Sequence, residues 1–234
     1  MKYIKKKKEP KSLTDKRNTE GSIYECAQLD WQKQLLNEQG YLCAYCMRPI
    51  SLERKNEKPC MEIEHYLSRY LCKQRKLDLG LRWQNMLGVC NGISGSEFHC
   101  DKTKGNKGKA NGKVELNVLN PLNVQTSEEI VTYTPLGQII PNTHNTALKE
   151  KIIEDLNCIL NLNNENLRLA RKDAMDRAKE FLIKNNPTGT WGVKEIDKEI
   201  VNWKSKTKDG RYRAYCQAAI WFLEYLKSKP IHKS

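Results

Sequence analysis

The sequence predicts an α+β protein in which a short region of strands and turns is embedded in a largely helical chain. Residues 41–112 contain strand-like pieces, turns and six of the nine cysteines, with few periodic apolar runs. Residues 145–227 instead repeat apolar side chains at helical spacing. The 234 residues are enough to bury a core in one large domain or two small ones.

The composition favours a negatively charged partner. The formal net charge is +13. Each phosphate that a basic side chain neutralises releases counterions, so this charge suits a nucleic acid better than a membrane or an acidic protein. A solvated, lysine-rich surface is the alternative. The longest strongly apolar stretch, 218–223, is too short to span a bilayer, and no apolar signal segment begins the chain. We therefore expect a cytoplasmic protein with reduced thiols.

The N-terminal part predicts an arm followed by a helix. Residues 1–22 are basic and polar, and we expect an arm that is flexible when free. Such an arm can lie along a phosphate backbone or a partner, or serve only as a solubilising tail. Residues 23–39 predict a helix that ends at Gly40, with Trp31 facing the core. Residues 101–113 are basic and interrupted by Gly and Asn, which predicts one helical turn and then an exposed loop.

The C-terminal part predicts a hairpin and then helices. Residues 130–134 and 138–140 form two strand-like runs around a turn at 135–137. After the hairpin, apolar side chains recur at helical spacing, so residues 116–234 are expected to be mostly helical. The apolar and aromatic stripes of these helices are typical of core packing. The predicted helices cover residues 145–160, 165–184, 194–206 and 211–227.

Four cysteines have the arrangement of a structural zinc site. Cys43 and Cys46 are separated by two residues, which lets both thiolates point inward from one tight turn. Cys90 and Cys100 supply the second pair across a polar, glycine-bearing loop that can bulge while its ends stay together. His99 is the alternative fourth ligand, or a phosphate contact. Zinc would replace a core that this short segment cannot build. The remaining cysteines are expected to be small buried residues, and they are Cys26, Cys60, Cys72, Cys158 and Cys216. Cys60 and Cys72 lie near the site in sequence and stay open as alternative ligands.

Residues that can activate water lie between and after these cysteines. Phosphodiester hydrolysis needs a base that deprotonates water and a cation that stabilises charge on the phosphate. Alternation over 61–65 predicts a strand on which Glu64 and His65 point to opposite faces, although a twist at its end can bring both to one cleft. Asn85 can fix the loop or His65 by hydrogen bonds. Asp101 directly follows the last cysteine, so the zinc would set its position.

The order of these motifs resembles that of HNH endonucleases. Cys-x2-Cys, Glu-His, Asn and Cys…Cys-Asp-x2-Lys-Gly follow one another as in that family. More narrowly, Cys90-Asn-Gly…His99-Cys100-Asp101-Lys-Thr-Lys104-Gly105 is similar to PtuB, the HNH component of Septu and retron-linked antiphage systems. The similarity is specific over this core and loose over the rest of the chain.

The resemblance implies a fold and residue roles. It implies a zinc-stapled ββα-metal (HNH) nuclease core over residues 23–115, with its leading helix, embedded in helices that dock a partner. His65 would be the general base, and Glu64 and Asp101 would bind a catalytic divalent cation. The carboxylate of Asp101, where many relatives have His or Asn, suits Mg²⁺ or Mn²⁺. Asn85 would orient the base or the scissile phosphate.

The resemblance also implies partners. They are an ABC/SMC-like ATPase and a reverse transcriptase with its RNA–DNA product. The substrate stays open between DNA and tRNA or another RNA, because no recognition code is visible. Two alternatives are a stand-alone restriction-like DNA nuclease and a non-catalytic zinc module that binds nucleic acid or a partner. The basic segment after Asp101 is expected to contact phosphates through Lys102, Lys104, Lys107 and Lys109.

Overall fold

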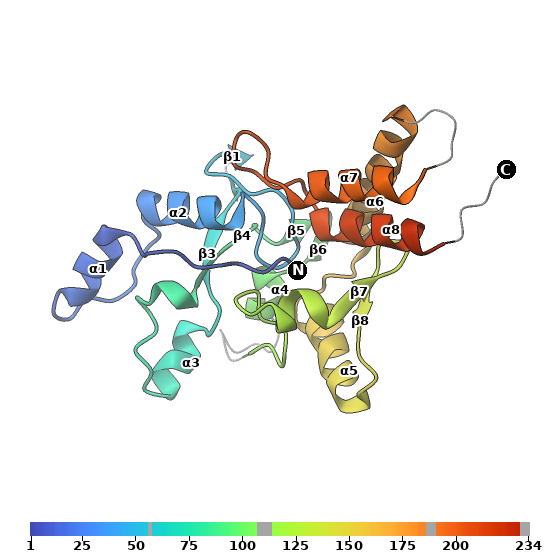
Figure 1. The fold of residues 1–234 in the computed structure, drawn as a ribbon. Helices are drawn as coiled ribbons and strands as arrows, with labels where there is room; N and C mark the ends of the chain where they lie inside the picture. Colours follow the sequence, from blue (N-terminus) through green and yellow to red (C-terminus); the bar gives the residue numbers. More distant parts are fainter. Residues whose placement is uncertain (56–57, 107–113, 186–190, 230–234) are drawn as a thin grey trace.

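The computed structural model describes residues 1–55, 58–106, 114–185 and 191–229. Helices dominate these residues, and the strands form separate two-stranded antiparallel pieces, so the predicted α+β class is confirmed (Figure 1). Their buried apolar side chains form one continuous core that reaches from Met1 to Leu223. The predicted regions 1–22, 23–115 and 116–234 therefore share a single core.

The first 22 residues do not form the free arm that the sequence predicts. They contain helix α1 (Lys11–Asn18), and the Ile4 amide donates to the carbonyl of Pro121 at 2.8 Å. Met1, Ile4 and Leu13 are all buried. The few apolar residues of this basic stretch pack into the core, while most of its lysines stay at the surface.

Helix α2 (Leu29–Gln39) ends as predicted but begins later. Gly40 closes it in the left-handed conformation, with φ of 58°. Residues 23–28 lie outside the helix because tertiary packing overrides their helical pattern. The ring of Tyr24 packs instead against Trp31, at 6.1 Å between ring centroids, and against His65.

Short elements follow α2 and lead into the central hairpin. A tight turn at 43–47 comes first, and the amide of Ala44 joins it to the carbonyl of Gly88 at 3.0 Å. The central strands β3 (Glu62–His65) and β4 (Met86–Val89) are antiparallel, with His65 opposite Met86. The remaining elements of this region are β1 (Arg54–Lys55), β2 (Lys58–Pro59), α3 (Arg69–Gln74), η1 (Trp83–Asn85), β5 (Ile93–Ser94), β6 (Glu97–Phe98) and α4 (Asp101–Asn106).

The C-terminal region has the predicted hairpin and helices. Strands β7 (Val131–Tyr133) and β8 (Ile139–Pro141) pair across a turn in which Gly137 has φ of 78°. A Cβ at Gly137 would lie 2.2 Å from the carbonyl oxygen of Arg168, so only glycine fits there. The other elements are η2 (Gln125–Glu129), α5 (Thr146–Ile153), η3 (Glu154–Ile159), α6 (Glu165–Asn185), α7 (Val193–Lys204) and α8 (Cys216–Ser228).

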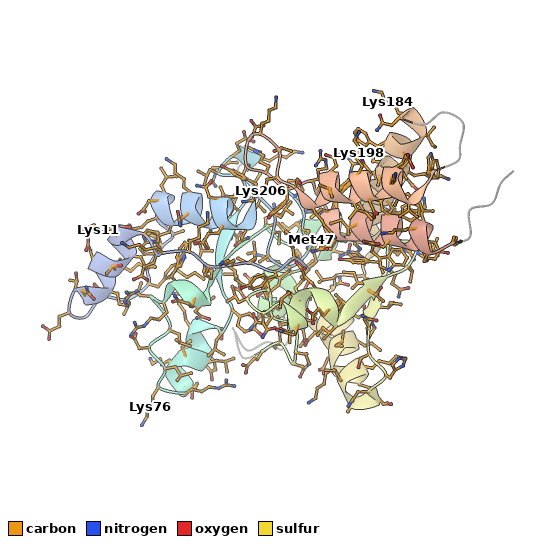
Figure 2. All side chains as sticks on the ribbon, in the orientation of Figure 1. Lys11, Met47, Lys76, Lys184, Lys198 and Lys206 are labelled. Carbon is orange, nitrogen blue, oxygen red and sulfur yellow. The ribbon has the colours of Figure 1, made fainter. Side chains whose placement is uncertain are left out.

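Helices α6, α7 and α8 lie together at one end of the molecule (Figure 1). The lysines labelled in Figure 2 project from its outside, whereas Met47 lies at its centre. None of the helices in the described ranges is both long and apolar enough to cross a bilayer.

Candidate functional site

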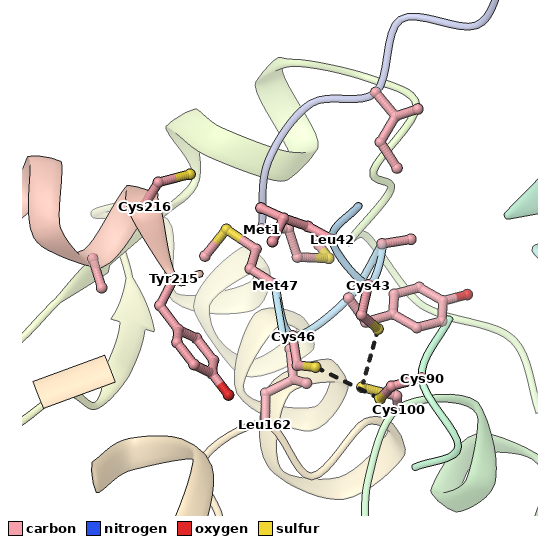
Figure 3. Close-up of a cluster of buried hydrophobic side chains, with 14 of the residues drawn as sticks. Met1, Leu42, Cys43, Cys46, Met47, Cys90, Cys100, Leu162, Tyr215 and Cys216 are labelled. Carbon is pink, nitrogen blue, oxygen red and sulfur yellow. Dashed lines mark hydrogen bonds between the residues drawn. The ribbon is translucent and has the colours of Figure 1, made fainter. Parts of the chain in front are cut away.

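Four cysteine sulfurs meet in the core and fit a tetrahedral metal. The thiols of Cys43, Cys46, Cys90 and Cys100 are buried, and their Sγ atoms all lie within 4.8 Å of one another (Figure 3). The Cys43–Cys100 and Cys46–Cys90 sulfurs are 3.9 Å and 3.8 Å apart. Four thiolates around zinc at about 2.3 Å would be separated by roughly 3.8 Å. The described residues thus contain the predicted group, and it could hold zinc.

The surrounding elements bring these sulfurs together. Cys43 and Cys46 sit on the turn after α2, Cys90 directly follows β4, and Cys100 directly precedes α4. The segment between Cys90 and Cys100 folds back on itself as the β5–β6 hairpin, so the two ends of the long spacer meet. This is the bulge that the glycine-bearing loop predicts.

His99 lies beside the sulfurs but outside the four-sulfur group. Its side chain is fully buried, with Nδ1 at 3.1 Å from the Sγ of Cys100 and 3.9 Å from that of Cys90. The cluster of four mutually close ligand atoms consists of cysteines alone. His99 therefore stands as a neighbour that can donate a hydrogen bond to a thiolate.

The expectation that the other cysteines are buried is only partly correct. Cys72 and Cys216 are buried and Cys60 is half-buried. Cys26 and Cys158 are exposed, because Cys26 lies in the irregular segment before α2 and Cys158 faces outward from η3.

A cleft of about 490 Å³ opens between β3, α3 and α4. Glu64, His65 and Asp101 all line it. Glu64 and His65 reach the same cleft because His65 is the last residue of β3, where the strand ends. Glu62 of β3 also lines the cleft, as do Tyr24, Arg69 and Lys102 from neighbouring segments.

The surroundings of His65 keep it neutral and fix its tautomer. Burial, with a smaller contribution from the positive charge of Arg69, lowers its pKa to about 4. Its Nε2 lies 2.9 Å from the carbonyl oxygen of Gly80. Since a carbonyl only accepts, Nε2 carries the proton and Nδ1 keeps its lone pair. The ring of Tyr24 meets the imidazole edge-on, with centroids 4.6 Å apart. His65 is thus arranged as a proton acceptor.

Glu64 is a buried carboxylate held between a lysine and a tyrosine. Burial raises its pKa well above the usual range, and the nearby Asp101 carboxylate adds to this rise. Lys104 opposes it, because its Nζ donates to Oε1 of Glu64 at 2.5 Å. The hydroxyl of Tyr45 donates to the same oxygen at 3.3 Å.

Asn85 acts on the backbone around the cleft and does not line it. Its Oδ1 accepts from the amide of Leu67 at 2.8 Å, and its Nδ2 donates to the carbonyls of Leu67 and Leu79 at 2.9 and 3.2 Å. These bonds tie the chain after His65 to the residue before Gly80. The geometry therefore agrees with the loop-fixing alternative, and Asn85 is not among the residues that line the cleft.

The basic segment differs from the prediction at Lys104. Lys102 is exposed and lines the cleft. Lys104, in contrast, is only 3% exposed, and its ammonium is engaged by Glu64 and by the carbonyl of Tyr66 at 2.8 Å. Position i+3 from Asp101 turns its side chain inward along α4, so an exposed phosphate contact is wrong for this residue. Lys107 and Lys109 lie outside the described residues.

Three residues that line the cleft or hold its histidine are not predictable from a motif. The sequence predicts a helix at Tyr24, Arg69 carries no motif, and Gly80 acts on His65 through its carbonyl. A backbone carbonyl leaves no signal in a sequence. The one visible cue in the sequence is Ser68, because its side chain caps α3 and so makes Arg69 the first residue of that helix.

The chain therefore combines a buried four-cysteine group that could hold a metal ion with a cleft whose neutral histidine and two carboxylates are suited to water activation. Over 124 residues the chain is 32% identical to "Retron Ec83 putative HNH endonuclease" of Escherichia coli, and the alignment covers 47% of each chain. The chain thus spans about half the length of the curated relative it matches. The matched half of the chain is thus similar to a protein named as an HNH endonuclease of a retron. No family profile matches the chain.

Proposed function

We propose that the chain is a metal-dependent HNH endonuclease that hydrolyses phosphodiester bonds in nucleic acid. One observation carries the proposal: His65, neutral and with Nδ1 as its proton acceptor, shares a cleft with the carboxylates of Glu64 and Asp101. The similarity to a retron protein named as an HNH endonuclease supports it.

The order of elements supports a ββα-metal core built from β3, β4 and α4. The two strands pair directly, and α4 begins with Asp101. Cysteines stand at both junctions, with Cys90 after β4 and Cys100 before α4. Zinc on the four thiolates would fix these junctions, and with them the position of Asp101 relative to β3.

In the proposed hydrolysis, His65 removes a proton from the water that attacks the phosphate. The proton goes to Nδ1, because Nε2–H remains bonded to the carbonyl of Gly80. That bond also stabilises the imidazolium that forms. Asn85 acts indirectly, since it holds the chain beside Gly80 and so the direction of the imidazole. A base arranged in this way contributes about 10²- to 10⁴-fold to a rate.

Glu64 and Asp101 fit a hard divalent cation. Carboxylate oxygens are ligands that Mg²⁺ and Mn²⁺ prefer. Two neighbouring carboxylates repel each other without a cation, which is one cause of the raised pKa of Glu64. Lys104 occupies Oε1 of Glu64 and so holds the carboxylate in place. When bound, the cation would stabilise negative charge on the phosphate and the leaving oxygen.

The cellular role in our proposal is that of an effector nuclease in antiphage defence. The retron context of the matched relative supports this role. The proposal includes an ABC/SMC-like ATPase partner that docks on the C-terminal region, and a reverse transcriptase with its RNA–DNA product. An ATPase gene beside the gene for this chain would support it, whereas an isolated gene would favour a stand-alone nuclease.

A cleavage assay tests the proposed activity. The purified protein is incubated with DNA and with total RNA under Mg²⁺ or Mn²⁺, with and without the products of neighbouring genes. We expect cleavage that His65→Ala abolishes while zinc content is retained, because base and zinc cluster are separate. His144→Ala is the matched control, since His144 is exposed and lies before α5. Undiminished cleavage by His65→Ala, freed of contaminating nuclease, would refute the assignment.

A further inference from the structure

Arg69 forms a wall of the cleft together with Tyr24 and His65. It is exposed and begins α3, four residues after the last residue of β3, and it lines the same cleft as His65. Its Nη1 donates to the carbonyl of Tyr24 at 2.9 Å, and its guanidinium carbon lies 5.0 Å from the centroid of the Tyr24 ring. Because this ring also meets the imidazole of His65, Tyr24 fixes the arginine and the histidine relative to each other.

The charges of the cleft leave Arg69 available for an anion. Among the described residues that line it, the carboxylates of Glu62, Glu64 and Asp101 lie on β3 and at the start of α4. No ion pair of the described residues involves Arg69. A guanidinium has five N–H donors, so the single bond to Tyr24 orients the group without exhausting it. A positive group held in this way matches a phosphate, which accepts two parallel N–H bonds from arginine.

We propose that Arg69 binds a backbone phosphate of the nucleic acid beside the scissile bond, with Tyr24 as the brace that holds the guanidinium in position. This inference rests on the proposed nuclease function and adds the residue that seats the substrate on the His65 side of the cleft. The brace lowers the entropy that ordering a long side chain would otherwise cost on binding. Lys104, which the sequence suggested for this task, is buried and engaged by Glu64.

A salt titration in a non-cleaving background tests the inference. His65→Ala protein is titrated with labelled single-stranded RNA, single-stranded DNA and duplex DNA at several salt concentrations. Arg69→Gln is expected to raise Kd about tenfold or more. It should also reduce the slope of log K against log salt by about 0.9 for the duplex or about 0.7 for a single strand. Arg69→Lys should keep the slope and bind with intermediate affinity, because it keeps the charge and loses the fork.

Arg75→Gln is the matched control. Arg75 caps the other end of α3 and pairs with Glu115 outside the cleft, so its loss should leave Kd and slope unchanged. Tyr24→Phe should bind nucleic acid like the parent, because Arg69 contacts the backbone carbonyl and the ring of Tyr24 and the substitution removes only the hydroxyl. The inference is overturned if Arg69→Gln matches Arg75→Gln on every probe, or if the parent binds none of them. If the His65→Ala parent binds with the expected slopes but the protein with His65 intact cleaves nothing, the nuclease function alone is refuted.

Discussion

Replacing Lys104 by Met tests whether the ion pair beneath the cleft is buried. Methionine keeps much of the length and the apolar stem of lysine and removes the ammonium. The Lys104 and Glu64 side chains are 4% and 9% exposed, and their charged atoms are 2.5 Å apart. The substitution would leave the Glu64 carboxylate buried with the hydroxyl of Tyr45 as its remaining donor.

The expected loss of stability is large because Glu64 stays buried without its cationic partner, as a charge or as a carboxyl that must take up a proton. Removing one partner of a buried ion pair costs about 3–5 kcal/mol, whereas exposed pairs contribute about 0–1 kcal/mol. At neutral pH we therefore expect the free energy of unfolding of Lys104→Met to fall by about 3–5 kcal/mol. For a chain of this size, each kcal/mol lowers Tm by roughly 2–4 °C.

Urea unfolding of the zinc-loaded protein measures this loss, with a surface pair as control. Lys172 and Asp176 are also 2.5 Å apart, but their side chains are 41% and 50% exposed. Lys172→Met should cost less than about 1 kcal/mol. Adding Glu64→Gln to Lys104→Met should recover much of the loss, because the unpaired charge is gone. If Lys104→Met costs no more than Lys172→Met, the pair is not buried in solution and a phosphate contact by Lys104 becomes tenable again.

Three further outcomes are expected. The pKa of His65, about 4 in the folded chain, lies below the value of about 6.5 expected when unfolded. Between pH 4 and 6.5 the unfolded chain therefore binds a proton that the folded chain does not. The contribution of neutral His65 to the free energy of unfolding is complete above pH 6.5 and decreases by about 3 kcal/mol towards pH 4. Urea unfolding across this range should show that decrease, and His65→Ala should lack it. If the free energy of unfolding of the two proteins changed with pH in the same way, the lowered pKa of His65 would be contradicted. Cys46→Ser should lose zinc and unfold, as metal analysis and circular dichroism would report, since metal binding and folding are coupled; a folded variant with full zinc would argue against the cluster. Lys107→Ala with Lys109→Ala should weaken binding to all sequences and flatten its salt dependence, and an unchanged slope would mean that this segment does not touch nucleic acid.

Patterns that depend on local spacing were predictable from the sequence. The two-residue spacing of Cys43 and Cys46 fixes a tight turn whatever surrounds it, and the β7–β8 hairpin follows from its turn residues. The C-terminal helices were predictable for the same reason, since a repeated apolar stripe needs only a surface to cover it.

Features that depend on distant packing were not predictable. Tyr24 leaves its helical pattern because the ring of His65, far along the chain, and that of Trp31 on α2 give it a better contact. Lys104 reads as a surface lysine, and only the position of Glu64 on β3 makes its burial tolerable. The packing of Met1 and Leu13 likewise requires a core that other segments supply.

The bond between the amide of Cys100 and the carbonyl of Leu160, at 2.8 Å, has a consequence for protein engineering. Leu162 belongs to the same buried core as the cluster cysteines, so the C-terminal half contributes to the cover of the sulfur cluster (Figure 3). A fragment cut at residue 115 would expose this apolar surface and lose a bond at the residue before α4. Grafting the cysteine motif into a foreign scaffold would therefore require a substitute for that cover. Activity should be mapped along this protein by point substitution, because truncation removes the support of the part that remains.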